Sequence, residues 1–534
     1  MNVKLNYLKF FLSIILIIFS FYINYYYANK GLYPIDSFTF FDTGYYITQG
    51  KHPIKDFWVI SGIFPDYIQA IFFSLFGKNW NSYIYHSSFF NILISLFIFF
   101  FLNQFNKNIF TNFFLSMCVG ILCYPVVGTP FPYQHSFILS VISLLVFYLG
   151  VEKNHKIYWF CLPILMMLSF LSMQLPSGLI NLLILIFLLF YLIYFDKSFI
   201  KYFTFGFLFS LFSLLSFIFI TKINIGDFIE QLILFPLTVG EGRIISSENA
   251  FESAKLINKL TIRGTIGHFK FINFFILSNI FLIFLHIKNK KKFKVDNIIF
   301  LNIFVLICSL SFIFHQLITA NQTFIFSLIP ILCGLVIIQI DKTKILKKNK
   351  IFNFIIAVII IFSTVKYHIE YNDKRKFMDL QNVNLSRAIK ASQLDSRFDK
   401  LKWITPTYFS NSPNEELNLL DESLQIIKKD KSKKMLITHY QFFSLLLNED
   451  LNIPNRWYYP NNTFPSSSEN KYYTSYLKKF DKKIYDGKIK SIYVLETAPD
   501  EMSFLKFTNL LNRRCFQKEK LNKILFKISI INCS

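Results

Sequence analysis

Eleven apolar runs of 16 to 21 residues recur along this chain and constrain its fold more than any other feature. Each run is close to the ~20 residues that a helix needs to cross the hydrocarbon core of a membrane. The runs lie at about 7–27, 84–103, 109–127, 133–150, 157–172, 178–195, 202–221, 269–287, 297–314, 323–340 and 351–366. The sequence therefore predicts a polytopic α-helical membrane protein with about 11 transmembrane helices.

The composition supports this class. Apolar residues make up 53% of the 534 residues, and 68 residues are Phe. A single protein core stops growing at roughly 250–300 residues, so lipid has to solvate the remaining apolar surface. Fibrous, disordered and disulfide-scaffold classes are thereby excluded. The net charge is +24, but 48 of the 56 basic residues are Lys. We interpret this charge as a topology signal plus a basic tail, and we predict no nucleic-acid partner.

The distribution of charge predicts the orientation of the spans. Segments on the N-terminal side of the membrane hold 17 Lys residues, whereas the short loops 128–132, 173–177 and 315–322 on the other side hold no Lys or Arg. Because basic loops stay in the cytoplasm, we expect a cytoplasmic N-terminus in a bacterial inner (plasma) membrane. Two long loops, 28–83 and 222–268, are then external, and the stretch 62–77 predicts an amphipathic helix at the membrane surface.

The composition changes after the last apolar run. Residues 367–534 hold 28 Lys or Arg and 19 Asp or Glu, which predicts a soluble domain outside the membrane domain of residues 1–366. Strand-like stretches at 401–405, 434–438, 490–495 and 524–531 alternate with helical patterns near 415–428, 441–447, 472–484 and 503–512. This alternation predicts a periplasmic or other extracytoplasmic α/β domain. We expect its last part, 515–533, to form a helix followed by a β-hairpin.

The seven cysteines divide by location. Five lie in predicted spans, where a cysteine usually packs as a small hydrophobic residue. Only Cys515 and Cys533 lie in the tail, where an oxidising compartment favours a disulfide over two free thiols. The chain has no metal-ligand spacing, so we predict no metal site.

The first external loop carries the most informative pattern. It reads Tyr33-Pro34-Ile35-Asp36 and, four residues later, Phe41-Asp42-Thr43-Gly44-Tyr45-Tyr46, then continues through Pro53 and Asp56-Phe57-Trp58. An acid shortly after the first span, an aromatic pair three residues on, and then Gly, Pro and an Asp-Phe step resemble the GT-C membrane glycosyltransferases. The pattern is most similar to bacterial lipid-linked-sugar transferases related to protein O-mannosyltransferases and to the lipid A aminoarabinose transferase.

This resemblance implies a GT-C-like fold and a reaction. A sugar would pass from a polyprenyl-phosphate donor to an extracytoplasmic glycan, lipid or protein acceptor. The resemblance makes Asp42 the general base and Asp56 a second acid that positions the acceptor. The usual acidic pair reads Asp-Glu, whereas Thr43 follows Asp42 here, so Asp36 remains an alternative base. Similarity to the metal-independent branch implies no cofactor, although the oligosaccharyltransferase branch uses a divalent ion.

The chemistry gives a separate reason to look for an acid and for cations. A glycosyl phosphate already has a good leaving group, so the main needs are a carboxylate beside the acceptor hydroxyl and positive charge at the departing phosphate. The second external loop offers Arg243, after Gly240-Glu241-Gly242, and Arg263. Only eight residues of the chain are Arg, and a guanidinium can bind phosphate in a bidentate way. We predict that both bind the donor phosphate; ordinary solvated loop positions are the alternative.

Aromatic and histidine side chains on the external side are candidates for the substrate cavity. We predict that this set comprises His52, Tyr45, Tyr46, Trp58 and His315. An aromatic belt at the membrane interface is the alternative interpretation.

Two other functions fit a chain with many spans and long external loops. One is an envelope polysaccharide polymerase or ligase, and the other is a lipid-linked-oligosaccharide flippase or transporter. Transporters usually place ionisable residues within their spans, near the midplane. The acid-poor spans and the long external tail therefore favour the glycosyltransferase.

Overall fold

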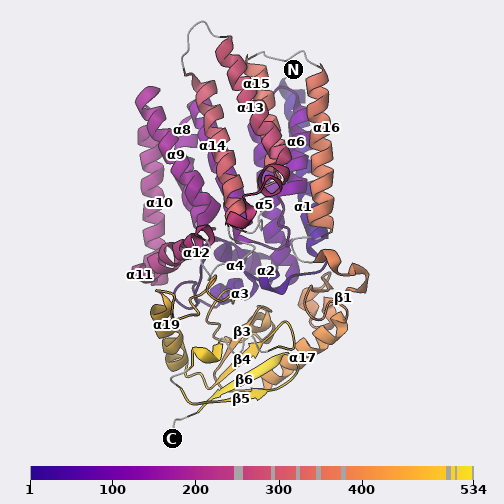
Figure 1. Cartoon of the computed structure of the whole chain (residues 1–534), viewed down its shortest axis with the longest axis vertical. Helices are drawn as coiled ribbons and strands as arrows, with labels where there is room; N and C mark the ends of the chain where they lie inside the picture. Colours follow the sequence, from indigo (N-terminus) through magenta and orange to yellow (C-terminus); the bar gives the residue numbers. More distant parts are fainter. Residues whose placement is uncertain are drawn as a thin grey trace.

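Each predicted span coincides with a helix in the computed structural model of the chain (Figure 1). These helices are α1 (Asn2–Ala28), α5 (Trp80–Asn103), α6 (Ile109–Cys123), α7 (Pro132–Lys153), α8 (Lys156–Phe170), α9 (Gln174–Tyr194), α10 (Ile200–Thr221), α13 (Lys270–Lys288), α14 (Asn297–Ile318), α15 (Leu328–Thr343) and α16 (Lys350–Tyr367). The structure describes residues 2–245, 256–289, 295–319, 325–343, 350–374, 380–500, 507–511 and 514–531. Within these ranges, eight helices are long and apolar enough to cross a membrane. The chain is thus a polytopic helical membrane protein. Because α6, α8 and α15 have only 15, 15 and 16 residues, the count of 11 spans remains a prediction.

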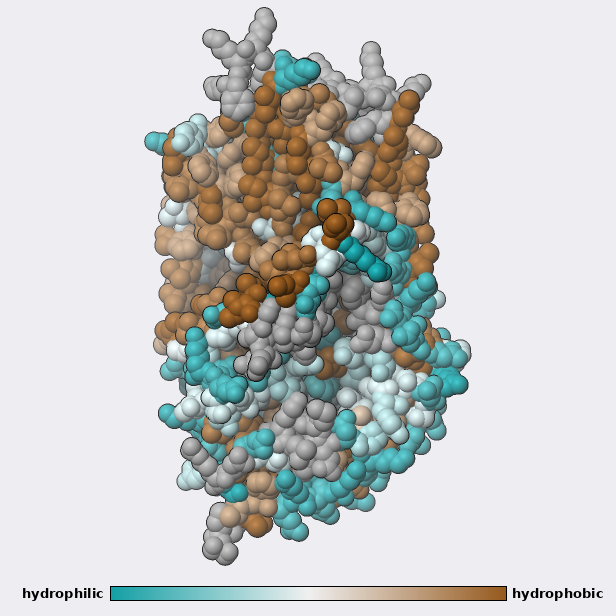
Figure 2. All heavy atoms as spheres, in the orientation of Figure 1, coloured by the Kyte–Doolittle hydropathy of each residue, from teal (hydrophilic) through white to brown (hydrophobic). Residues whose placement is uncertain are grey.

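Helix α7 forms the centre of the bundle. The whole apolar stretch of α7 is buried. It packs against α5, α8, α9 and α14. A helix that is apolar on every side is suited to such a position. On the outside, α10 exposes Phe205, Phe212 and Phe219, the last with 84% of its surface accessible. Apolar residues cover much of the bundle surface visible in Figure 2, whereas the tail is largely polar there. This contrast marks the bundle as the lipid-facing part.

The first external loop folds into three helices between the bundle and the tail (Figure 1). They are α2 (Pro34–Ser37), α3 (Phe41–Thr48) and α4 (Phe64–Phe76). Gly44 allows α3 to approach α4 closely, since a Cβ atom there would lie 2.6 Å from Gln69 Cγ. Helix α4 buries Phe73 on one face and exposes Ile71 and Leu75 on the other. The helix predicted at 62–77 is therefore present, and its location at the membrane surface stays a prediction.

The second external loop is also largely helical. It contains α11 (Ile225–Ile229), the π-helix η1 (Glu230–Leu234), α12 (Phe235–Ile244), the short 3-10 helix η3 (Leu256–Lys259) and the π-helix η4 (Arg263–Gly267). Helix α12 contacts both α14 and η3, so this loop closes over one end of the bundle.

The tail contains a four-stranded mixed sheet of order β3-β4-β6-β5. Its strands are β3 (Lys434–Thr438), β4 (Ser491–Leu495), β5 (Phe516–Lys520) and β6 (Leu525–Ile530); β3 and β4 are parallel, and the other pairs are antiparallel. Helices α17 (Pro413–Lys429), α18 (Phe443–Leu447) and α19 (Tyr473–Asp486) accompany it, and a small pair, β1 (Ile389–Lys390) and β2 (Lys402–Trp403), precedes it. Short helical turns connect these elements: η5 (His368–Asp373), η7 (Leu380–Asn382), η8 (Leu385–Arg387), η9 (Ala391–Gln393) and η10 (Ser396–Phe398). The predicted α/β class is therefore confirmed.

One expectation for the tail is wrong. The segment after residue 514 begins with strand β5 rather than with a helix, whereas the predicted β-hairpin is confirmed by the antiparallel pair of β5 and β6. Strand β5 pairs with β6 from Phe516 opposite Ile530 to Lys520 opposite Phe526. Because cross-strand pairing depends on the partner strand, the local pattern of β5 alone does not reveal it.

The tail and the first external loop share one apolar core. Phe38 and Phe41 of the loop contact Phe398 of the tail, with ring centroids 6.3 and 5.8 Å apart. Phe38 also packs on Trp403 and Phe442. The change in composition at residue 367 is therefore not a break in packing.

Candidate active site

A cavity of about 660 Å³ lies where the bundle, both external loops and the tail meet. The bundle and the second loop supply a mainly apolar wall, which includes Leu175, Leu179, Leu232, Ile233, Pro236, Leu237, Ile244, Phe314 and Ile318. The first loop supplies Tyr33, Ile35, Asp36 and Ile60, and the tail supplies Trp457, Tyr458, Tyr459, Asn462 and Thr463. Among the described lining residues, only Asp36, Glu241 and Arg243 carry a formal charge. One acid and one arginine predicted from sequence therefore share this cavity.

Asp36 is the acid of the first loop that reaches the cavity wall. It lies half-buried in α2, where Pro34 begins the helix. A proline at the first helical position presets the backbone angle and needs no N–H donor. The tail holds the adjoining peptide in place, since Trp457 Nε1 donates a hydrogen bond of 2.8 Å to the carbonyl oxygen of Ile35. The position of Asp36 thus depends on both the first loop and the tail.

Asp42 has a different environment. It is fully buried, and its carboxylate accepts hydrogen bonds from the backbone N–H groups of Ser444 (3.3 Å) and Leu445 (3.0 Å). These groups belong to the first turn of α18, whose N-cap residue, Phe442, provides no side-chain cap. Burial raises the pKa of Asp42 to about 7, although the two amide donors oppose this rise. Asp42 therefore caps a tail helix, and the structure does not bring it to the cavity.

Asp56 and His52 form a turn in the first loop. The Asp56 carboxylate accepts a hydrogen bond of 2.7 Å from the His52 backbone N–H. The His52 Nδ1 atom lies 2.9 Å from the Tyr67 hydroxyl. Desolvation lowers the pKa of His52, against the opposing influence of Asp56. Neither residue lines the cavity.

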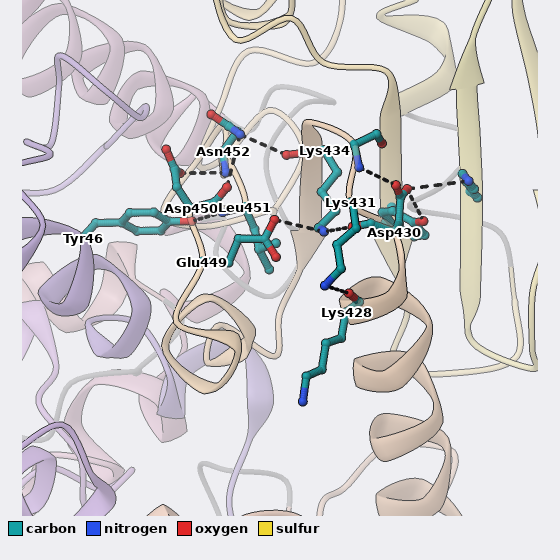
Figure 3. A network of polar contacts seen from close by, with 12 residues as sticks. Tyr46, Lys428, Asp430, Lys431, Lys434, Glu449, Asp450, Leu451 and Asn452 are labelled. Carbon is teal, nitrogen blue, oxygen red and sulfur yellow. Dashed lines mark hydrogen bonds and ion pairs between the residues drawn. The ribbon is translucent and has the colours of Figure 1, made fainter.

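The three predicted aromatic residues of the first loop face the tail. Tyr45 donates a hydrogen bond to the Asn448 side chain, and the Tyr46 hydroxyl accepts one of 3.0 Å from the backbone N–H of Leu451 (Figure 3). Trp58 packs edge-on against Tyr476 of α19, with ring centroids 5.3 Å apart. None of the three lines the cavity. In this structure the three side chains contact the tail, and their contact with substrate stays a prediction.

The two arginines that we predicted to bind phosphate lie in different places. Arg243 lines the cavity from α12, and its Nε atom has no hydrogen-bond partner among the described residues. Arg263 is exposed in η4 and does not line the cavity. His315 is buried behind the wall, with its ring centroid 5.5 Å from that of the lining residue Tyr133.

Lys259 was not recognised from the sequence; it lies near Arg243, although it is not among the residues that line the cavity. Its Nζ atom is buried and lacks a hydrogen-bond partner in the described part of the chain. Burial and the nearby positive charge of Arg243 lower the pKa of Lys259 to about 8. Two neighbouring cations with unused donors are suited to an anion. In a chain with 48 Lys residues, sequence gave no means of choosing this one.

A buried ion pair connects the first loop to the tail. Arg456 Nη1 lies 2.6 Å from Asp66 Oδ2, and both side chains are at most 1% exposed. The Thr43 hydroxyl donates a hydrogen bond of 2.6 Å to Asp66, and the Gly62 carbonyl accepts one from Arg456. Desolvation raises the pKa of Asp66, whereas Arg456 opposes this rise. The pair directly precedes the cavity-lining segment that begins at Trp457.

Two further predictions concern metal ions and the disulfide of the tail. Among the described residues, no group of three or more His, Cys, Asp or Glu side chains could hold a metal ion. Cys515 is disulfide-bonded, and Cys533 lies outside the described residues, so the predicted pairing stays a prediction. Five span cysteines are free thiols.

The architecture is thus a helical bundle with a folded first long loop and a terminal α/β tail. Among solved structures, the chain is similar to ArnT from Cupriavidus metallidurans bound to undecaprenyl phosphate, with a TM-score of 0.50 and 9% identity. The similarity covers 99% of this chain and 98% of that one. Neither protein-family models nor curated protein sequences give a match. The chain therefore shares the fold of ArnT, which is the fold that the resemblance of the first-loop pattern predicts.

Proposed function

We propose that this chain is an integral-membrane glycosyltransferase that moves a sugar from a polyprenyl-phosphate donor to an extracytoplasmic acceptor. The observation that carries the proposal is the single cavity shared by Asp36, Arg243 and an extended apolar wall. ArnT, which has the same fold, was crystallised with undecaprenyl phosphate. A prenyl chain suits the apolar wall, and its phosphate suits the cations at Arg243 and Lys259.

The reaction requires one bond exchange at the sugar. The acceptor oxygen bonds to the anomeric carbon while the bond from that carbon to the phosphate oxygen breaks. Asp36 accepts the proton of the acceptor hydroxyl, as a general base within hydrogen-bond reach. Arg243 and Lys259 stabilise the negative charge that develops on the departing phosphate. The carrier leaves as a phosphate monoester. None of these steps requires a metal ion, and we propose that the enzyme acts without one.

The orientation that we propose places the cavity on the external side of the membrane. The N-terminus and the tail lie at opposite ends of the bundle (Figure 1), and the cavity lies at the tail end. With a cytoplasmic N-terminus in a bacterial inner membrane, the reaction takes place on the external face.

Binding of the carrier tests the proposal directly. We expect purified protein in nanodiscs to bind undecaprenyl phosphate, and Arg243→Ala to weaken this binding by roughly tenfold or more, as expected for loss of a charge-assisted contact. Arg263→Ala is the matched control and should bind like the parent, because Arg263 lies outside the cavity. Equal binding by the parent and Arg243→Ala would refute the phosphate site. Movement of the lipid across vesicles without any sugar transfer would favour a flippase instead.

A further inference from the structure

The cavity wall contributed by the tail differs chemically from the wall contributed by the membrane domain. Tyr459, Asn462 and Thr463 bring uncharged polar groups, whereas the wall near α12 is mainly aliphatic and also carries Glu241 and Arg243. A lipid-linked sugar has the same division between an apolar chain and a hydroxyl-rich head. The tail wall is therefore the side on which to look for sugar contacts.

Two amide side chains in this cavity have unused hydrogen-bonding atoms. Asn462 is 7% exposed, and its Oδ1 atom has no partner among the described residues. Gln174 lines the cavity from the start of α9, and neither its Nε2 nor its Oε1 atom has a hydrogen-bond partner among the described residues. Buried polar atoms are nearly always satisfied, so each of these atoms calls for an explanation. A bound molecule with hydroxyl groups supplies both donors and acceptors.

The segment that carries Asn462 is held in a fixed conformation. The Tyr459 backbone N–H donates a hydrogen bond of 2.7 Å to the Thr463 hydroxyl, and the Asn461 N–H donates one of 3.0 Å to the Phe464 carbonyl. Phe464 is 1% exposed and anchors the segment in the tail core. A preorganised loop loses little conformational freedom when a ligand binds. Asn462 is thus presented to the cavity before any substrate arrives.

We infer that Asn462 and Gln174 recognise the hydroxyl groups of the transferred sugar, and that this sugar is neutral. The inference rests on the proposed function and adds the class of the sugar to it. Neutral amides form good hydrogen bonds with hydroxyls, whereas a charged sugar would need a counter-charge beside them. The residues that the tail contributes to the cavity are all uncharged, and Asp36 and Arg243 already serve as the base and the phosphate ligand in the proposed function. The same tail segment holds the peptide beside Asp36 through Trp457, so sugar recognition and the base belong to one connected unit.

Competition binding separates recognition of the sugar from recognition of the phosphate. Labelled undecaprenyl phosphate is bound to the protein in nanodiscs and displaced by unlabelled carrier or by its glucosyl, galactosyl, mannosyl, uronosyl and amino-sugar esters. For the parent, we expect at least one neutral ester to compete more strongly than the bare carrier. Asn462→Ala and Gln174→Ala should each reduce this gain by about fivefold to tenfold, as expected for loss of a hydrogen bond to a substrate hydroxyl. Their affinity for the bare carrier should remain within about twofold of the parent.

Asn411→Ala is the matched control, since Asn411 is an exposed tail asparagine outside the cavity wall. The inference is overturned if the gain is unchanged in both cavity variants, which is the result expected if water satisfies the amides. It is also overturned if both variants lose bare-carrier binding to the same extent, which indicates a structural role. Preference of the parent for a charged ester would contradict the neutral class. Failure of the parent to bind the carrier at all would instead refute the proposed function.

Discussion

A carboxylate acts as a general base only where the hydroxyl that it deprotonates can reach it. Asp36 is half-buried at the cavity wall. Asp42 is enclosed by protein and uses its oxygens to hold the first turn of α18. At the residue scale, burial and position relative to the cavity therefore assign different roles to two acids that lie six positions apart.

Removal of the Asp42 carboxylate should affect stability. Asp42→Ala leaves two N–H groups of α18 without an acceptor, and we expect the free energy of unfolding to fall by about 1–2 kcal/mol, as for loss of an N-cap. Asp42→Asn retains an acceptor oxygen and should be less damaging. Chemical denaturation in detergent micelles measures both variants. Stability of the Ala variant equal to that of the parent would show that the cap contributes nothing.

The lowered pKa of Lys259 predicts the pH dependence of carrier binding. Lys259 is protonated below its pKa of about 8 and becomes neutral above it. Affinity for undecaprenyl phosphate should therefore be highest below pH 8 and fall by up to about tenfold between pH 7 and 9, the limit for one linked proton. Lys259→Arg stays charged over this range and should remove the dependence. An identical decline in that variant would assign the effect to another group.

At the scale of elements, the buried pair of Asp66 in α4 and Arg456 in the tail predicts a strong coupling. Asp66→Asn leaves a buried guanidinium without its counter-charge, so we expect a loss of about 3–5 kcal/mol in the free energy of unfolding. The double variant Asp66→Asn, Arg456→Met should lose less than the sum of the two single changes. Additive losses in this double-mutant cycle would mean that the two side chains act independently.

Elements whose character is set locally could be predicted from the sequence. Any span must carry about 20 apolar residues, whatever its neighbours are, so the runs located the membrane helices. The sequence predicts a hairpin in this part of the tail but not the start of β5, because its exposed Lys518 and Lys520 are stabilised by pairing with β6 and not by their own pattern. The roles of Asp42 and Tyr46 could not be predicted from the sequence either, since their partners lie about four hundred positions further along the chain.

At the scale of the whole molecule, the tail is part of the fold of the first external loop. Phe398, Trp403 and Phe442 of the tail lie in one apolar cluster with Phe38 and Phe41 of the loop. The sequence located the change in composition at residue 367 but gave no sign of this shared core. It likewise identified Asp36 and Arg243 but did not indicate that the tail completes their cavity.

This shared core predicts the behaviour of the isolated tail. Residues 367–534 expressed alone would expose these aromatic side chains to water, so we expect binding of a hydrophobic dye and a broad thermal transition. The full chain is the control and should bind less dye per tail. A sharp, cooperative unfolding transition of the isolated tail would show that it folds independently of the loop.

The central claim is that Asp36, and not Asp42, is the base of a lipid-linked-sugar transferase. The most direct measurement is transfer of labelled sugar from undecaprenyl-phosphate sugars to a cell-envelope fraction by the parent, Asp36→Asn and Asp42→Asn, each checked for folding. The account predicts a fall of at least about 100-fold in the transfer rate for Asp36→Asn, within the usual contribution of a general base. It predicts a rate near that of the parent for folded Asp42→Asn. The opposite result, with Asp36→Asn active and Asp42→Asn inactive, would contradict it.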